Sequence, residues 1–247
     1  MSHRRIVRLL GEPRTAAEAR RPYMLRRNIL IFHSGAIGDF ILSWPLAMAL
    51  GRLYPQSRVI YVTHSQKGEL ARQLLRVEWR DAESGWHILH GADGELPEAQ
   101  AKLLSGASAV YSFVSSNGEM WMERVRRMAP WAELRALKTT PPLGYPRHAS
   151  QYLLDQLYAN RAVYSGVQQM IQWLGQRGLG HRGGTEGPIV IHPGSGSPAK
   201  CWPLTQYMRL ARRFVEDARR VVFLLGEAEL EAYDSEQVRQ LESIGEV

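Results

Sequence analysis

The feature that most constrains the fold of this chain is a recurring order of a short apolar segment, a turn of small residues and a helical pattern. Asn28–His33 is apolar and flanked by arginines, which predicts a buried parallel strand, and Asp39–Tyr54 shows helical spacing of its apolar residues. The same order returns at Pro188–His192 and Leu204–Asp217. This repetition of strand and helix predicts an α/β protein built on parallel sheets.

The segments between these two strand–turn–helix units also alternate between strand and helix patterns. The predicted elements are a strand at Arg58–Thr63, a helix at Lys67–Arg76, a strand at Trp86–Leu89, a helix at Leu96–Leu104, a strand at Ala107–Val114 and a helix at Gly118–Met128. Three prolines and a glycine in 139–147 then interrupt regular structure. After this break, helices are predicted at His148–Asn160 and Gly166–Gly178. The strand and helix at Pro188–His192 and Leu204–Asp217 are followed by a predicted strand at Arg220–Leu225 and a predicted helix near Ala228–Leu241.

These patterns divide the chain into four parts. Residues 1–27 form a basic extension, 28–147 a first Rossmann-like domain, 148–187 interdomain helices with a glycine-rich linker, and 188–247 a second domain. With 247 residues, 45% of them hydrophobic, the chain can bury one or two cores. The single cysteine, Cys201, excludes an internal disulfide and a cysteine-based zinc cluster.

The net charge of +7 is concentrated at the N-terminus. Residues 1–27 hold eight arginines and two glutamates, a charge of +6, so the other 220 residues carry only +1. A nearly neutral body argues against a nucleic-acid-binding protein. The extension is either a solvated leader or a segment attracted to an anionic membrane surface. The sequence lacks both the apolar core of a secretory signal and the roughly 18 apolar residues of a membrane span.

The turn after the first predicted strand is one candidate site. Its residues are His33, Ser34, Gly35, Gly38 and Asp39. Glycines in such a turn let the backbone approach a ligand closely. Asp39 stands where a helix N-cap is expected, a role worth about 1 kcal/mol. It is also a candidate general base, because ligands gather at the carboxyl ends of parallel strands. The spacing alone leaves both roles open.

The loop IVIHPGSGSPAKCWP at 189–203 is the second candidate site. The candidate anion-binding residues in it are Ser195, Gly196, Ser197 and Lys200. Backbone N–H groups and hydroxyls near a helix start bind anions, and Lys200 would supply charge to a diphosphate. An ordinary βα loop with an exposed lysine explains the same composition. We expect His192 to be buried and hydrogen-bonded, and Trp202-Pro203 to begin a helix.

A nicotinamide-dependent oxidoreductase is a different class of α/β protein, and the sequence disfavours it. The first turn has GxxG rather than GxGxxG spacing. The strand predicted at Arg58–Thr63 does not end in the acidic residue that would bind the ribose of the dinucleotide.

Several motifs in order resemble the ADP-heptose:lipopolysaccharide heptosyltransferases. The motifs are ILIFHSGAIGDFILSWPLAMAL, then HASQYL at 148–153, then VIHPGSGSPAKCWPLTQYMRLARRF followed by VVFLLGEAE. The resemblance runs from about residue 27 to the last residue. These enzymes are inverting glycosyltransferases of GT-B fold. The resemblance therefore implies two Rossmann-like domains and a sugar transfer that needs neither a metal nor a cofactor.

The resemblance also implies a role for each candidate residue. Asp39 matches the aspartate proposed to deprotonate the acceptor hydroxyl, and the loop from Ser195 to Lys200 matches the one that holds the donor diphosphate. Glu229 matches the acid that contacts the donor ribose, with Glu227 as the alternative. The first half would bind a lipopolysaccharide core acceptor and the second half ADP-heptose. Such an enzyme acts in the cytoplasm and contacts the cytoplasmic face of the inner membrane peripherally.

The sequence departs from the family pattern in three places. Residues 1–27 are an extension, and His33 stands where relatives often carry a basic residue. The family continues into strands with an Asp-Ser/Thr-Gly…His segment that completes the donor pocket, and these 247 residues hold no such segment. We therefore expect a C-terminally truncated chain whose second domain is incomplete and leaves a parallel edge exposed. The alternative function is that of a catalytically inactive fragment, or of a module that binds a sugar nucleotide or lipid A.

Overall fold

The computed structural model describes residues 27–91, 94–115, 119–180, 187–195 and 198–247. The chain divides into two compact units, Met1–Gln176 and Arg177–Val247. Nearly all of the predicted basic extension and most of the predicted linker lie outside the described residues. Within the described ranges, no helix combines the length and the apolar character that crossing a membrane requires.

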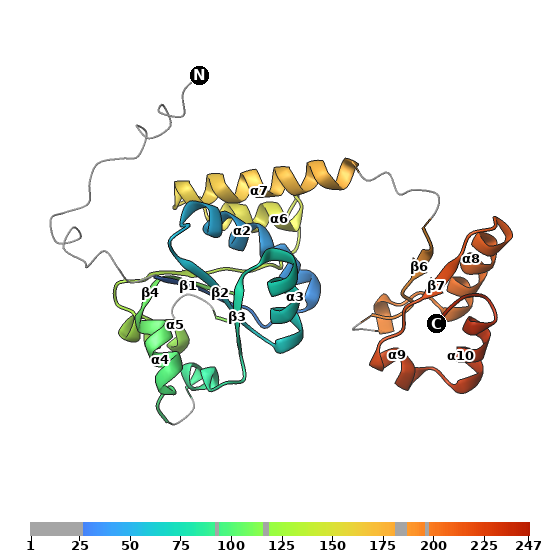
Figure 1. The fold of residues 1–247 in the computed structure, drawn as a ribbon, viewed down its shortest axis with the longest axis horizontal. Coiled ribbons are helices and arrows are strands. Elements are labelled where there is room, and N and C mark those ends of the chain that lie inside the picture. The colour runs from blue at the N-terminus through green and yellow to red at the C-terminus, as the bar shows by residue number, and fades with distance from the viewer. Residues whose placement is uncertain (1–26, 92–93, 116–118, 181–186, 196–197) are drawn as a thin grey trace, which may run out of the picture. The chain divides into compact units, whose positions relative to one another are not determined.

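The first unit is built around a parallel sheet (Figure 1). Across the described residues of this unit, the sheet has five strands in the order β3-β2-β1-β4-β5. The strands are β1 (Asn28–Phe32), β2 (Arg58–Thr63), β3 (Glu78–Asp81), β4 (Ala107–Ser112) and β5 (Glu133–Ala136). All neighbouring strands run parallel. The α/β fold with a parallel sheet, predicted from the alternating pattern, is confirmed.

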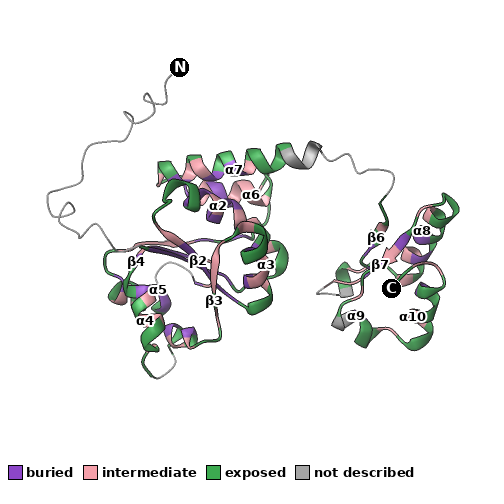
Figure 2. Cartoon of the chain, in the orientation of Figure 1, coloured by how far each residue is buried: buried purple, intermediate pink, exposed green. Residues whose placement is uncertain are grey.

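β1 lies at the centre of this sheet because its residues are apolar on both faces. Ile29 and Ile31 belong to the hydrophobic core on one face, and Leu30 and Phe32 belong to the core on the other. All five residues of β1 are buried. The two edge strands β3 and β5 carry charged residues and are mostly half-buried, as Figure 2 shows by colour for β3.

Helices cover both faces of the sheet (Figure 1). The helices that contribute to the core with Ile29 are α1 (Ile37–Leu42), α2 (Trp44–Leu53), α3 (Ser65–Leu75), α6 (Ala149–Gln156) and α7 (Arg161–Gly180). Those that contribute to the core with Leu30 are η3 (Trp86–His90), α4 (Glu98–Ser105) and α5 (Met120–Met128). The helices predicted for the interdomain part thus pack within the first unit, through residues such as Leu153 and Val167.

Two predicted elements of the first unit take a different form. The helix predicted over Asp39–Tyr54 is interrupted at Ser43, between α1 and α2. Pro45, in the first turn of α2, has no N–H to donate to the preceding turn, so the helix restarts there. The strand predicted at Trp86–Leu89 is wrong, because this segment forms the 3₁₀ helix η3 between Gly85 and Gly91. Both glycines adopt left-handed backbone, with φ of 93° and 106°, which closes the segment into a tight turn.

The second unit has a smaller parallel sheet. Its elements are β6 (Ile189–Ile191), η4 (Pro198–Lys200), α8 (Leu204–Glu216), β7 (Val221–Phe223), α9 (Glu227–Ala232) and α10 (Ser235–Glu242). β6 and β7 pair in parallel, and their side chains form a core with Met208, Ala211 and Leu241. The helix predicted near Ala228–Leu241 is split in two, because Asp234 caps a new helix by accepting from the N–H of Gln237 at 2.8 Å.

One edge of this second sheet is covered by the last residues of the chain. Glu246 pairs in parallel with Val222, donating to the carbonyl of Val221 at 3.0 Å and accepting from the N–H of Phe223 at 2.6 Å. The Arg220 guanidinium forms two hydrogen bonds with the Glu246 carboxylate, at 2.7 and 2.6 Å, and holds this segment in register. The expectation of an exposed parallel edge is therefore wrong for β7. Among the described residues, the other edge of the sheet, along β6, pairs with no strand.

Candidate functional site

The residues of the first candidate turn lie at the carboxyl end of β1. His33 follows β1 directly, and its main-chain N–H donates to the carbonyl of Val62 at 3.0 Å. Its side chain is buried, and the ring lies 5.3 Å from the ring of Phe40 and 5.2 Å from that of Phe113, centroid to centroid. Neither ring nitrogen has a hydrogen-bond partner in the described part of the chain. His33 is thus an imidazole enclosed by aromatic rings.

The surroundings of His33 keep its ring uncharged. Burial, and after it the positive charge of Lys67, lowers the pKa of His33 from the ordinary 6.5 to about 4, against the opposing effect of Asp39. At neutral pH one ring nitrogen therefore carries a hydrogen and the other is an acceptor. His33 does not supply the positive charge that a basic residue at this position would bring.

Asp39 lies in the first turn of α1, where it does not cap the helix. The N-cap is Ala36, whose carbonyl accepts from the N–H of Phe40 at 2.9 Å. The interpretation of Asp39 as the N-cap is therefore wrong, because the helix begins three residues earlier than that role requires. The half-buried Asp39 side chain is left available for a contact outside the helix.

The side chains of His33 and Asp39 both lie close to the backbone of Gly35. A Cβ added to Gly35 would lie 3.1 Å from Cε1 of His33 and 3.3 Å from Cβ of Asp39, so a side chain there would be crowded from both sides. A Cβ added to Gly38 would meet no described atom within 4 Å. A side chain is therefore crowded at Gly35 and has open space at Gly38, and the approach of a ligand to these two glycines stays a prediction.

Lys67 belongs to this site and was missed in the sequence. It lies in the first turn of α3, and its ammonium donates to the carbonyls of Ser34 and Gly35 at 3.2 and 2.6 Å. Partial burial lowers the pKa of Lys67. The lysine thus fixes the turn between β1 and α1 and brings a positive charge to it. Its only sequence signal was a basic residue at the start of the helix after β2, which is common on solvated helices.

The turn that carries Asp39 is supported from the sheet. The Ser43 hydroxyl donates to the carbonyl of Phe40 at 2.6 Å and lies 2.8 Å from the Tyr61 hydroxyl on β2. The rings of Phe40 and Tyr61 lie 4.9 Å apart. Burial raises the pKa of Tyr61, so its hydroxyl stays protonated and donates to Ser43. The residues of α1 that follow Asp39 are therefore fixed to β2.

Polar side chains also stand at the carboxyl ends of the strands beside β1. The buried hydroxyl of Thr63, at the end of β2, has no hydrogen-bond partner among the described atoms. At the end of β4 the hydroxyls of Ser112 and Ser115 lie 2.7 Å apart. The carboxyl edge of this sheet is thus lined by small hydroxyl groups near His33. A polar residue at the last position of a strand was the signal that could have identified them.

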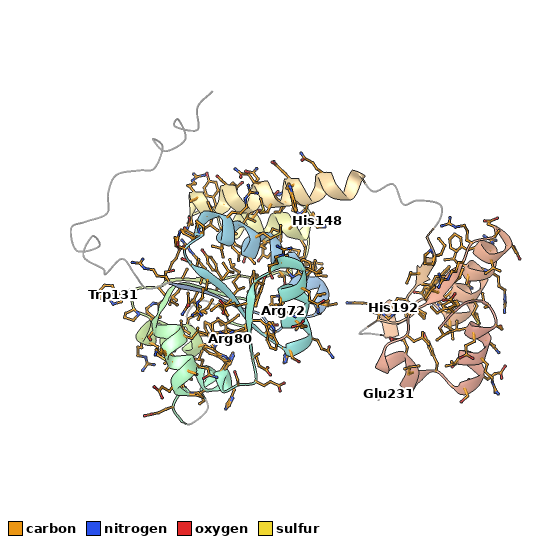
Figure 3. The ribbon with its side chains drawn as sticks, viewed as in Figure 1. Arg72, Arg80, Trp131, His148, His192 and Glu231 are labelled. Atoms are coloured by element: carbon orange, nitrogen blue, oxygen red, sulfur yellow. The ribbon has the colours of Figure 1, made fainter. Side chains whose placement is uncertain are left out.

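The second candidate loop follows β6, and only part of it is described. Ser195 is half-buried and Lys200 is exposed, whereas Gly196 and Ser197 lie outside the described residues. His192 is exposed, not buried as predicted, and points out from the unit at the end of β6 (Figure 3). Its Nδ1 donates to the carbonyl of Leu224, 2.8 Å away, which leaves Nε2 as the acceptor in the neutral ring. The predicted helix start at Trp202-Pro203 is confirmed, with Pro203 as the N-cap of α8.

Glu229 lies against this loop. Its buried carboxylate accepts from the N–H of Gly226 at 2.8 Å, which caps the start of α9. A Cβ added to Gly194 would lie only 1.7 Å from Oε1 of Glu229. The fold thus brings together the loop after β6 and the carboxylate after β7, which are 35 positions apart in the sequence. The side chain of Glu227, the alternative residue, lies outside the described set.

The two sets of residues suit different chemistry. In the first unit, Asp39, His33 and Lys67 combine a carboxylate, a neutral imidazole and an ammonium, which suits binding and deprotonation of a hydroxyl. In the second unit, the loop with Ser195 and Lys200 suits an anion, and the adjacent Glu229 suits hydroxyl groups. Over the described ranges, no three His, Cys, Asp or Glu side chains gather as metal ligands.

Comparison with known proteins finds solved structures of similar fold at low sequence identity. No family model matches the chain, and no curated protein matches it. A glycosyltransferase family 9 structure from Veillonella parvula has a TM-score of 0.50 and 18% sequence identity, covering 91% of this chain and 69% of that one. The Escherichia coli heptosyltransferase WaaC with ADP also has a TM-score of 0.50, with 11% identity, covering 88% of this chain and 70% of that one. This chain therefore has the GT-B fold of these glycosyltransferases.

Proposed function

We propose that the protein is an inverting glycosyltransferase that transfers a heptose or a related sugar from ADP-heptose to a lipopolysaccharide core acceptor, without a metal or a cofactor. The GT-B fold supports the reaction class, although fold alone does not define a substrate. The observation that carries the proposal is the contact of Glu229 with Gly194. This contact places the candidate anion-binding loop after β6 beside a carboxylate. Both lie at the carboxyl ends of parallel strands, where α/β proteins bind nucleotides.

The donor would be held by the second unit. Ser195, Gly196, Ser197 and Lys200 would bind the diphosphate through N–H groups, hydroxyls and one ammonium. An ionised carboxylate has about four acceptor positions, and Glu229 uses one for the N–H of Gly226. The others are available for the hydroxyls of a ribose. Charge on the leaving diphosphate would thus be stabilised by protein groups alone.

The acceptor would be activated by the first unit. Asp39 would remove the proton from the acceptor hydroxyl as the oxygen attacks the anomeric carbon and the diphosphate leaves. Lys67 fixes the carbonyls of Ser34 and Gly35 and so sets the shape of the turn that receives the acceptor. His33 is buried and uncharged, with its pKa lowered to about 4, so it would shape the acceptor side of this turn without supplying a charge.

The acceptor class implies a place for the enzyme in the cell. A lipopolysaccharide core is carried on a membrane lipid, so the enzyme would act in the cytoplasm at the face of the inner membrane. The +6 charge of residues 1–27 supports peripheral attraction to anionic lipid headgroups. Nucleic acid is not an expected partner, since the other 220 residues carry a charge of only +1.

Calorimetry with ADP and ADP-heptose on the whole chain tests the donor site. We expect Lys200→Ala and Glu229→Gln each to weaken ADP binding by about tenfold or more, since each removes a charged contact. Lys102→Ala, an exposed lysine of α4 in the first unit, is the matched control and should bind ADP normally. Equal ADP affinity in all four proteins would refute the assignment of the donor site.

Release of ADP in the presence of a lipopolysaccharide core acceptor tests the reaction itself. We expect release that depends on the acceptor and is lost in Asp39→Asn. Donor binding with no release at any acceptor concentration would instead favour the alternative, a module that binds a sugar nucleotide without transferring the sugar.

A further inference from the structure

A cavity lies at the opposite end of the first sheet from His33. It has a volume of about 590 Å³, within the range of cavities that bind small ligands. It is lined by the first residues of β2, by the ends of α2 and α3, and by α7. Because His33 and Asp39 lie at the carboxyl ends of the strands and this cavity at their amino ends, the cavity is separate from the candidate acceptor site.

The walls of this cavity are apolar and adaptable. The apolar lining residues are Ala47, Met48, Leu75, Val77, Met170 and Trp173. Of these, Ala47 and Met170 are buried, and Trp173 is 37% exposed. Methionine side chains are flexible and polarisable, so two of them can fit around an aliphatic chain.

Charged side chains also line the cavity. Arg52, Arg58 and Arg76 line the cavity with a single acidic residue, Glu78. Glu78 is already shared, because Arg58 and Arg80 lie 3.6 and 3.3 Å from its carboxylate. Arg52 and Arg76 have no carboxylate within ion-pair distance among the described residues. The cavity therefore combines apolar walls with two arginines whose charge is not neutralised by a described acid.

This combination determines what kind of ligand would fit. A cationic occupant is disfavoured by the arginines, and this excludes the chain's own extension, which carries a charge of +6. A small anion such as phosphate would leave the apolar walls in water. We propose that the cavity binds a single-chain anionic amphiphile, with a phosphate on Arg52 and Arg76 and an aliphatic chain along Met48, Met170 and Trp173.

Dodecyl phosphate, used below its micelle concentration, is a suitable probe of this cavity in the whole chain. We expect calorimetry to give one bound molecule per chain. Dodecyltrimethylammonium has the same aliphatic chain and the opposite charge, and inorganic phosphate has the charge without the chain. Both should bind at least about tenfold more weakly, because each satisfies only one part of the cavity. Equal binding of the cationic probe would overturn the proposal.

Gly51 provides a way to block the cavity. It lines the cavity on α2, and a Cβ added there would meet no described atom within 4 Å. Gly51→Phe should therefore fill the cavity without disturbing the helix, and weaken dodecyl phosphate binding by about tenfold or more. Unchanged affinity in a Gly51→Phe protein with normal melting would overturn the proposal.

A second variant tests the charges of the cavity. Arg52→Gln combined with Arg76→Asn removes both unneutralised arginines, and asparagine tolerates the left-handed backbone of Arg76, φ 58°. This variant should lose binding, whereas Arg126→Gln with Arg127→Gln, on α5 at the other face of the sheet, should keep it. Equal loss in both double variants would mean that only overall charge matters and would overturn the proposal.

Discussion

The carboxylate of Glu229 occupies the space beside Gly194 in which a side chain would otherwise stand. A Cβ built on Gly194 would lie 1.7 Å from Oε1, 2.1 Å from Cδ and 2.5 Å from Cγ of Glu229. Since the carboxylate also caps α9 through the N–H of Gly226, it cannot move aside without releasing that bond. The backbone after β6 and the start of α9 are thus fitted to each other, and only glycine is compatible with the fit.

Gly194→Ala should therefore destabilise the second unit and damage the donor site together. Overpacking of this kind typically costs about 1–3 kcal/mol of unfolding free energy. We expect a lower urea midpoint for the second unit and ADP binding weakened by about tenfold. Gly187→Ala is the control, because a Cβ there meets no described atom within 4 Å. Full ADP affinity in Gly194→Ala would separate Glu229 from donor binding.

Asp39→Asn should abolish most of the proposed transfer while leaving the fold intact. The amide has nearly the same shape but cannot accept the acceptor's proton, and loss of a general base typically lowers a rate by about 10²–10⁴-fold. ADP affinity should not change, because Asp39 belongs to the first unit. Asp217→Asn, at the exposed C-cap of α8, should transfer normally. Normal turnover by Asp39→Asn would remove Asp39 from the mechanism.

The buried His33 should make the first unit less stable in acid. Its folded pKa, about 4, is below the ordinary 6.5, so between these values the unfolded chain binds more protons than the folded one. The stability that the folded state gains from an uncharged His33 is fully present above pH 6.5 and is lost as pH falls towards 4. This lowers the unfolding free energy by roughly 3 kcal/mol. Unfolding free energy measured at pH 7 and pH 4 should differ less in His33→Phe than in the natural protein. The same change at exposed His87 should leave the pH dependence as it was.

Gly51 on α2 and Gly166 on α7 should respond to alanine in opposite directions. Gly51→Ala places a methyl in open space and improves helix propensity, so it should stabilise the first unit by about 1 kcal/mol. Gly166→Ala would bring a Cβ to 3.0 Å from Cδ1 of Leu53 and 3.3 Å from Cβ of Ala49, and should destabilise it. Thermal melting of the two variants measures both effects. A stabilised Gly166→Ala would show that α7 can move away from α2.

The alternation of apolar and helical segments was enough to predict the central strands but not the edges of the sheet. β1, β2 and β4 were predicted because their residues are apolar and buried on both faces. β3, with the sequence EWRD, and β5, with ELRA, were missed, since each is four residues long and carries charged side chains that an edge strand can expose to water. Pairing with the neighbouring strand, rather than local pattern, determines their conformation.

The candidate site was predictable where it depends on one continuous segment. The turn from His33 to Asp39 was found from its glycines and its position after a strand. Lys67 was not found, because its role depends on hydrogen bonds to backbone carbonyls 32 and 33 positions away. For His192 the predicted burial was wrong, whereas the predicted hydrogen bond is confirmed, with an acceptor, the carbonyl of Leu224, that comes from another strand end.

The hydrogen bonds around Ser43 have a consequence for any reaction in which Asp39 takes part. Ser43 joins the end of α1 to Tyr61 on β2, so the orientation of the Asp39 turn is set by the folded sheet. The entropy of placing the backbone that carries Asp39 is therefore lost when the chain folds, and not when a substrate arrives. Correct folding of the first unit thus sets the position of this backbone before any substrate binds.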